Sequence, residues 1–254
     1  MTRIVVFDSG LGSLSIIKSI QQICKTEIIY FADQKHFPYG NKTRKQLDLI
    51  IKNSLNLLEK KFHPEFIVMG SNTPTIMLDI KKKNIFGVTP PINEAAKKTN
   101  TKNIAILATE SVVKSKNLSK YIKKCKISKK IKIHKINASN LVQLVESGKF
   151  LENELYCKKI IRNSLKQIFL KNKIDTVTLS STHLPFLKSF FQSEFPNIQF
   201  IDPAESIAAK ILKKIKTRQT KRNSLKIFSS GQTKLFQKNL NRMGIKNKIK
   251  FLSI

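Results

Sequence analysis

One stretch decides the fold of this chain: FIVMGSNTPT, residues 66–75. Its four apolar residues predict a short buried strand, which stops abruptly at Gly70 in a cluster of small polar side chains. A second stretch, TVTLSSTHLP at residues 176–185, repeats this order in the later half of the chain. We therefore predict two strand ends of similar design that together form one polar site.

The composition is that of a folded protein. The chain has 254 residues, of which 41% are hydrophobic, and this is enough for a buried core in one large or two small domains. Its apolar runs are too short to cross a bilayer. The N-terminus begins directly with strand-like sequence and lacks the layout of a signal peptide. We therefore expect a cytoplasmic protein with no membrane partner.

The formal net charge is +32. A charge of this size is typical of proteins that bind nucleic acids or anionic membranes. The lysines, however, accompany abundant Ile and Asn, a composition that an AT-rich genome would also produce. The runs Lys81–Lys83, Lys123–Lys124 and Lys213–Lys214 lie in three separate regions. The sequence thus favours nonspecific attraction to polyanions at low salt over specific nucleic-acid binding.

Strand-like and helix-like segments alternate almost throughout, which predicts an α/β fold with mostly parallel sheets. We expect two similar open domains, one formed by residues 1–96 with 205–254 and the other by residues 97–204. No Gly/Pro/Ser linker separates them, so close packing is expected. Two predicted helices bear on the site: one follows Met69 and runs to about Lys82, and one spans Val112–Ile122.

Open α/β sheets bind ligands beyond the carboxyl ends of their strands. The polar residues that follow predicted strands are Asp8, Ser9, Ser71, Asn72, Thr73, Thr109, Ser181, Thr182 and His183. His183 is a candidate general acid or base because imidazole titrates near neutral pH. Taken singly, each of these residues is also explained by a structural role as a helix cap or turn residue.

Several other chemistries lack their motifs. Gly10 and Gly12 are not followed by the third glycine of a dinucleotide fingerprint, and no P-loop occurs. Ser71 is not in the Gly-x-Ser-x-Gly pattern of a serine hydrolase. The histidines and cysteines show no metal-ligand spacing. We therefore expect no metal and no cofactor.

Five motifs in order carry a resemblance to a known family. They are FDSGLG at 7–12, PYGNK at 38–42, SNT at 71–73, LVESG at 144–148 and STHLP at 181–185. Together they resemble the glutamate racemases, members of the cofactor-independent aspartate/glutamate racemase superfamily, over nearly the whole chain. The resemblance implies two α/β domains related by a pseudo-twofold axis, a site in the cleft between them, no cofactor, and a homodimer as the assembly.

The resemblance also implies a chemistry, the inversion of L- or D-glutamate at the α-carbon for the supply of peptidoglycan precursors. In that family two cysteines, one in each polar strand end, face the α-carbon from opposite sides. One removes the α-proton and the other returns a proton. By resemblance, Asp8, Glu146 and His183 assist these transfers. The implied substrate-binding residues are Ser9, Pro38, Tyr39, Gly40, Asn72, Thr73, Thr109 and Thr182.

Both cysteine positions hold serine here, Ser71 and Ser181. A thiol ionises near a pKa of about 8.5, whereas a serine hydroxyl is far less acidic and needs an adjacent base. The replacement predicts loss of most of the two-base mechanism unless Asp8 supports Ser71 and His183 supports Ser181. Three functions stay open: a racemase with altered bases, a former racemase that binds an acidic amino acid or related carboxylate without turnover, and a basic polyanion-binding protein.

Overall fold

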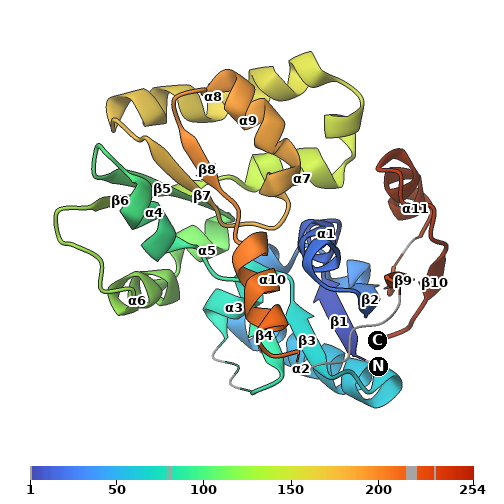
Figure 1. Cartoon of the computed structure of the whole chain (residues 1–254). Coiled ribbons are helices and arrows are strands. Elements are labelled where there is room, and N and C mark those ends of the chain that lie inside the picture. Colours follow the sequence, from blue (N-terminus) through green and yellow to red (C-terminus); the bar gives the residue numbers. More distant parts are fainter. Residues whose placement is uncertain (1, 79, 81, 216–221, 232) are drawn as a thin grey trace. The chain divides into compact units, whose positions relative to one another are not determined.

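The computed structural model describes residues 2–78, 80, 82–215, 222–231 and 233–254. The chain divides into two compact units, which Figure 1 shows in sequence colours. Unit 1 comprises Met1–Val88 and Ala204–Ile254, and unit 2 comprises Thr89–Pro203. Among the described residues, no helix combines the length and the apolar character needed to cross a membrane.

Unit 1 is built on a six-stranded sheet in the order β10-β9-β2-β1-β3-β4, with every pairing parallel. Its strands are β1 (Arg3–Asp8), β2 (Glu27–Ala32), β3 (Phe66–Met69), β4 (Ile85–Gly87), β9 (Ser224–Ser229) and β10 (Ile249–Phe251). Phe7 of β1 is paired with Met69 of β3. Asp8 and Gly70 therefore leave neighbouring strands at the same edge of the sheet.

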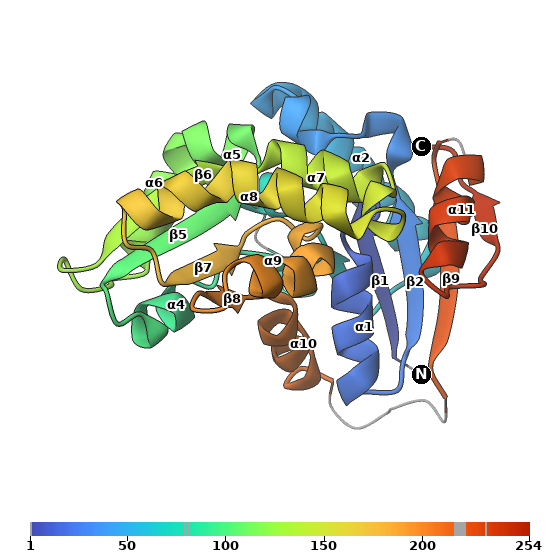
Figure 2. The ribbon, with the colours of Figure 1, turned by 90° about the horizontal axis from the view of Figure 1, so that it is seen from above.

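Helices cover both faces of this sheet. They are α1 (Leu14–Ile23), α2 (Arg44–Phe62), α3 (Asn72–Met77), α10 (Ala204–Leu212) and α11 (Thr233–Arg242), with the 3-10 turns η1 (Gln34–His36) and η2 (Tyr39–Asn41). Helices α1 and α10 pack side by side (Figures 1 and 2). Leu47 and Ile51 of α2 are buried in the same core cluster as Val5 and Phe7 of β1. Burial on both sides explains why β1 and β2 are continuous apolar runs.

Unit 2 contains a four-stranded parallel sheet in the order β6-β5-β7-β8. Its strands are β5 (Asn103–Ala108), β6 (Lys132–Asn137), β7 (Thr176–Leu179) and β8 (Gln199–Ile201). Its helices are α4 (Ile92–Lys98), α5 (Glu110–Lys114), α6 (Lys116–Lys124), α7 (Ser139–Glu146), α8 (Glu154–Lys171) and α9 (Lys188–Glu194), with 3-10 turns η3 (Lys149–Leu151) and η4 (Leu184–Leu187). Leu107 is paired with Leu179, so β5 and β7 also end at one edge. The predicted α/β class with parallel sheets is confirmed.

Two predicted helices are wrong in extent. The helix expected to reach Lys82 ends at Met77, because Leu78 is extended and buries its side chain in the core of unit 1. The helix expected over Val112–Ile122 divides into α5 and α6 at Ser115. That serine is extended, and its hydroxyl accepts a hydrogen bond from the N–H of Leu118 at 3.1 Å. Its preference for the N-cap position breaks the apolar periodicity that predicted one helix.

Candidate active site

The first strand end, Gly70–Thr73 in unit 1, begins where β3 stops. Gly70 extends the ladder by donating its N–H to the carbonyl of Phe7 at 2.8 Å. A Cβ at Gly70 would lie 1.9 Å from Oγ of Ser13 and 2.8 Å from its Cβ. The same Ser13 hydroxyl donates to the Gly70 carbonyl at 3.0 Å. Glycine is therefore required where β3 passes the start of α1.

The polar side chains of the first strand end are buried. Ser71 is the N-cap of α3, yet its side chain accepts no capping hydrogen bond. Its carbonyl accepts a hydrogen bond from the Thr75 hydroxyl at 2.8 Å. The side-chain oxygen and nitrogen of Asn72 are buried, and neither has a hydrogen-bond partner among the described residues. Since an unsatisfied buried polar group costs about 1–3 kcal/mol, the amide of Asn72 is suited to a polar ligand.

Asp8 and Ser9 stand beside the first strand end, at the end of β1. Both are buried, with exposures of 1% and 4%. The N–H of Ser9 donates to Oδ1 of Asp8 at 2.6 Å, which fixes the carboxyl group. Because Phe7 is paired with Met69, Asp8 lies across the ladder from Gly70. This edge of unit 1 therefore offers one buried carboxyl group next to hydroxyl and amide groups.

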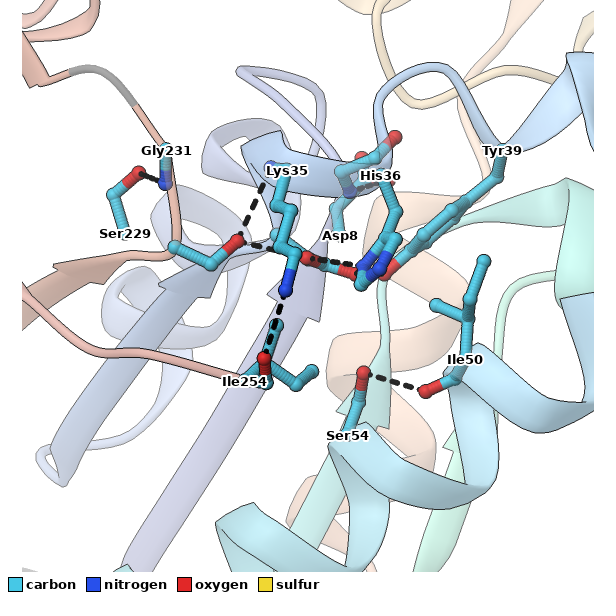
Figure 3. Close-up of polar contacts among 12 residues, drawn as sticks. Asp8, Lys35, His36, Tyr39, Ile50, Ser54, Ser229, Gly231 and Ile254 are labelled. Atoms are coloured by element: carbon cyan, nitrogen blue, oxygen red, sulfur yellow. Dashed lines mark hydrogen bonds and ion pairs between the residues drawn. The ribbon is translucent and has the colours of Figure 1, made fainter.

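A buried carboxylate that the motifs did not identify is Asp33, which follows β2 as Asp8 follows β1. Nδ1 of His36 lies 2.8 Å from Oδ2 of Asp33, and the Tyr39 hydroxyl donates to that same oxygen at 3.0 Å. The Ser230 hydroxyl donates to Oδ1 at 2.8 Å. Figure 3 shows His36 and Tyr39 converging with Asp8 nearby. Its position after a strand was the sequence signal that could have found Asp33.

This Asp33 cluster is tied to the first strand end through the backbone and through η2. The N–H of Asp33 donates to the Asp8 carbonyl at 2.7 Å. The turn η2, which contains Tyr39 and Gly40, packs on α3. Pro38 precedes Tyr39 after a cis peptide bond, and both Pro38 and Gly40 are half-buried. The structure thus brings the predicted PYG motif next to the helix that begins at Asn72.

Tyr39 is a neutral hydrogen-bond donor in this cluster. Burial raises its pKa well above the ordinary value, and the negative charges of Asp33 and Asp8 raise it further. The hydroxyl is only 3.0 Å from Asp33, so its proton is directed at that carboxylate. Tyr39 therefore serves the site by fixing the loop, and Asp33 is the group that holds it.

The second strand end, Ser180–His183 in unit 2, begins where β7 stops. Ser180 donates its N–H to the carbonyl of Leu107 at 2.8 Å. Its hydroxyl lies 2.9 Å from Oγ1 of Thr178, inside the unit. Ser181 and Thr182 follow, with exposures of 7% and 3%. Ser180 therefore belongs to the fold, and Ser181 is the first residue of this end whose side chain is placed for chemistry.

His183 is held by a carboxylate. Its Nε2 lies 2.9 Å from Oε2 of Glu146, the last residue of α7, and both side chains are largely buried. A carboxylate that hydrogen-bonds an imidazole fixes the orientation of the ring. Thr109, which follows β5 and caps α5, lies at the same edge of the sheet, and its hydroxyl is 3.3 Å from that of Ser111. Unit 2 therefore brings together the predicted residues Thr109, Glu146, Ser181, Thr182 and His183.

A cavity of about 760 Å³ lies elsewhere in unit 2, between α8, α9 and the starts of β7 and β8. Its wall includes Asp175, which accepts hydrogen bonds from the Thr99 hydroxyl and from the N–H groups of Asn100 and Thr101. Burial acts to raise the pKa of Asp175, but these hydrogen bonds prevail and lower it. The carboxylate of Asp175 thus stabilises the turn formed by residues 99–101. Within the described ranges, no three His, Cys, Asp or Glu side chains gather into a metal-binding group.

Comparison with known proteins agrees with this geometry, although no family model matches the chain. The glutamate racemase of Buchnera aphidicola subsp. Schizaphis graminum is 34% identical over 231 residues, which cover 87% of this chain and 88% of that protein. A glutamate racemase isoform from Bacillus anthracis has a crystal structure with a TM-score of 0.84 at 23% identity, covering 100% of this chain and 98% of that one. Escherichia coli glutamate racemase, in complex with L-glutamate and the activator UDP-MurNAc-ala, gives 0.80 at 22% identity, with coverage of 99% and 98%.

The structural matches show that the chain has the fold of these two glutamate racemases. The sequence match to the Buchnera protein has a higher identity, 34%, over 87% of this chain. The chain belongs to the glutamate racemase family. This confirms the family predicted from the five motifs.

Proposed function

We propose that this protein inverts an acidic amino acid at its α-carbon without a cofactor, with glutamate as the leading substrate. Family membership supports the reaction, and the Escherichia coli relative has been crystallised with L-glutamate. The observation that carries the proposal is the contact of 2.9 Å between Nε2 of His183 and Oε2 of Glu146. His183 stands two residues after Ser181. It supplies an acid–base group that a serine hydroxyl cannot supply alone.

In the proposed mechanism the two strand ends face opposite sides of the substrate α-carbon. One end accepts the α-proton, the C–H bond breaks, and its electron pair is delocalised into the α-carboxyl group. The other end then gives a proton to the opposite face. Asp8 acts with Ser71 at the first end, and His183 acts with Ser181 at the second. One proton has then moved from one end to the other, and exchange with solvent restores the starting state.

We further propose that the substrate is held from both units. On the first side Ser9, Asn72 and Thr73 supply hydrogen-bonding groups, with Pro38, Tyr39 and Gly40 shaping the wall. On the second side Thr109 and Thr182 do so. The unpaired amide of Asn72 supports this proposal, because the ligand would complete its hydrogen bonds. A homodimer, a cytoplasmic location and domain limits near residues 96 and 204 stay predictions from the sequence.

A second function, binding of an acidic amino acid or related carboxylate without turnover, is favoured by the same amide. Asn72 needs a ligand whether or not a proton moves, and hydroxyls at positions 71 and 181 can donate hydrogen bonds to a carboxylate. This function keeps the site and loses the reaction. In racemisation the α-proton of the ligand is removed and replaced, whereas in this second function it stays in place.

The test incubates the protein in D₂O with L- and D-glutamate and with both enantiomers of aspartate, and follows the α-proton by NMR. A racemase replaces the α-proton by deuterium. Absence of exchange in all four amino acids at high protein concentration would overturn the enzyme proposal. Calorimetry with the same compounds then tests the second function, binding without turnover. This function requires that the native protein gives binding heat and that Asn72→Leu gives none. An absence of both exchange and heat contradicts both functions.

A further inference from the structure

A basic surface of unit 2 lies outside the strand ends. Between residues 111 and 145 the chain has no acidic residue, and between 114 and 135 it has ten lysines. These are Lys114, Lys116, Lys120, Lys123, Lys124, Lys126, Lys129, Lys130, Lys132 and Lys135. All ten are exposed. The chain as a whole has 48 Lys and Arg in 254 residues, which is a lower density than that of this segment. The dispersed pattern inferred from the three lysine runs therefore does not hold here.

These lysines, called the lysine face below, lie on the last residue of α5, on α6, on the loop after it and on β6. Strand β6 is an edge strand of the unit 2 sheet, and the green segment of Figures 1 and 2 contains α6, the loop after it and β6. The ammonium group of Lys135 donates to the Ser119 hydroxyl at 2.6 Å, which joins β6 to α6. Lys114 pairs with Glu110. The other eight ammonium groups have no hydrogen-bond or ion-pair partner among the described residues, so their charge faces solvent.

The chemistry of the face selects among polyanions. Helices that lie on membranes insert apolar side chains, but the face carries no exposed large hydrophobic residue, and Leu118 of α6 is fully buried. Single-stranded nucleic acids stack on exposed aromatic rings. The face has Tyr121, which is half-buried and donates its hydroxyl to the Pro90 carbonyl at 3.0 Å. Of these polyanions, a nucleic-acid duplex fits the face best, because it offers regularly spaced phosphates to flexible ammonium groups.

We propose that the lysine face binds the phosphate backbone of double-stranded DNA without reading its sequence. Arginine supplies the commonest specific base contact, and no arginine occurs between residues 114 and 135. Lysine neutralises phosphates as a point charge, and each such contact releases counterions. Binding is therefore strongly salt-dependent and equal for duplexes of different sequence. This inference is independent of the proposed racemase function.

The test measures the affinity of the full chain for a fluorescent DNA duplex, by anisotropy, over a series of salt concentrations. The face variant is K123Q/K124Q/K129Q/K130Q. The matched control is K45Q/K60Q/K234Q/K238Q, which removes four exposed lysines of unit 1 that have no partner among the described residues. We expect the face variant to bind at least about tenfold more weakly at low salt, with the slope of log K against log salt reduced by about 3 to 4. The control changes affinity by less than about threefold.

Circular dichroism verifies that both variants are folded, which is expected because all eight positions are exposed. Equal losses in the two variants would overturn the proposal, since the total charge would then explain the binding. So would a native protein that does not bind DNA, or a marked preference between two duplexes of equal length. Vesicles of phosphatidylglycerol form the last arm. If they bind through the face while DNA does not, the partner is a membrane and the proposal fails.

Discussion

The two strand ends share a backbone arrangement. Gly70 and Ser180, the residues directly after β3 and β7, each donate an N–H at 2.8 Å to the neighbouring strand. Their side-chain space differs, because a Cβ at Gly70 would collide with Ser13, whereas Ser180 fits a hydroxyl that lies 2.9 Å from Thr178. The position directly after the strand therefore tolerates a side chain in unit 2 and excludes one in unit 1.

The polar groups that follow differ more. The first end presents Asn72, whose amide has no hydrogen-bond partner in the part of the chain that the structure describes, with the buried carboxyl group of Asp8 beside it. The second presents His183, already held by Glu146. The acid–base groups proposed for the two ends are a carboxyl group at the first and an imidazole at the second, so the two ends are not chemically equivalent. Two similar sequence patterns have thus produced one end with an amide that no described residue hydrogen-bonds and one end with an imidazole held by a carboxylate.

The largest expected effect comes from replacing the serine of each strand end, Ser71 and Ser181, by cysteine. In S71C/S181C a thiolate can form at each end, so we expect α-proton exchange of glutamate in D₂O to rise by about 100-fold or more. S128C/S193C, at two exposed serines, is the control and leaves the rate unchanged. If S71C/S181C binds glutamate by calorimetry but exchanges no faster than the native protein, the two ends do not flank the α-carbon.

The next effect separates the two ends. Asp8→Asn keeps the oxygen that accepts from Ser9, and His183→Gln keeps an amide within reach of Glu146, so both variants should fold. Each removes one proton-transfer group, and we expect exchange to fall by about 100-fold. In the proposed mechanism each end acts on one face of the α-carbon, so the two variants should impair opposite enantiomers. NMR exchange rates for L- and D-glutamate measure this, and impairment of the same enantiomer by both variants would contradict the assignment.

A smaller effect concerns stability. Gly70→Ser copies the second end into the first and forces a side chain against Ser13, so we expect a loss of roughly 1–3 kcal/mol in the free energy of unfolding. Ser180→Gly makes the reverse change and removes one hydroxyl contact with Thr178, at a cost of about 1 kcal/mol. Urea denaturation measures both. Ser13→Gly should relieve the Gly70→Ser variant, and failure to do so would mean that another contact excludes the side chain.

The sequence predicted the strand ends well and the buried network poorly. Strands β3 and β7 have the predicted limits, because each is a short strand-like run that ends at a cluster of small polar residues. The Asp33 cluster was missed because it depends on Ser230, 197 residues away, which reaches Asp33 only once β9 pairs with β2. Long-range contacts of this kind leave no local periodicity. A local contact can also mislead a prediction. One predicted helix divides at Ser115 because the N-cap hydrogen bond of this serine outweighs the apolar periodicity of the segment.

The smallest effect compares a buried tyrosine of unit 1, Tyr39, with a half-buried tyrosine of unit 2, Tyr121. Burial raises the pKa of Tyr39 well above its ordinary value and that of Tyr121 to about 12. In the unfolded chain a tyrosine titrates near 10, so each contribution to stability is complete below pH 10 and is lost as the pH rises above it. Between about pH 10 and 11 each tyrosine lowers the free energy of unfolding by at most about 1.4 kcal/mol per pH unit. Tyr39→Phe and Tyr121→Phe should each flatten the pH dependence measured by urea denaturation over that interval, relative to the native protein. An unchanged slope in Tyr39→Phe would show that its hydroxyl is less isolated from solvent than its contact with Asp33 implies.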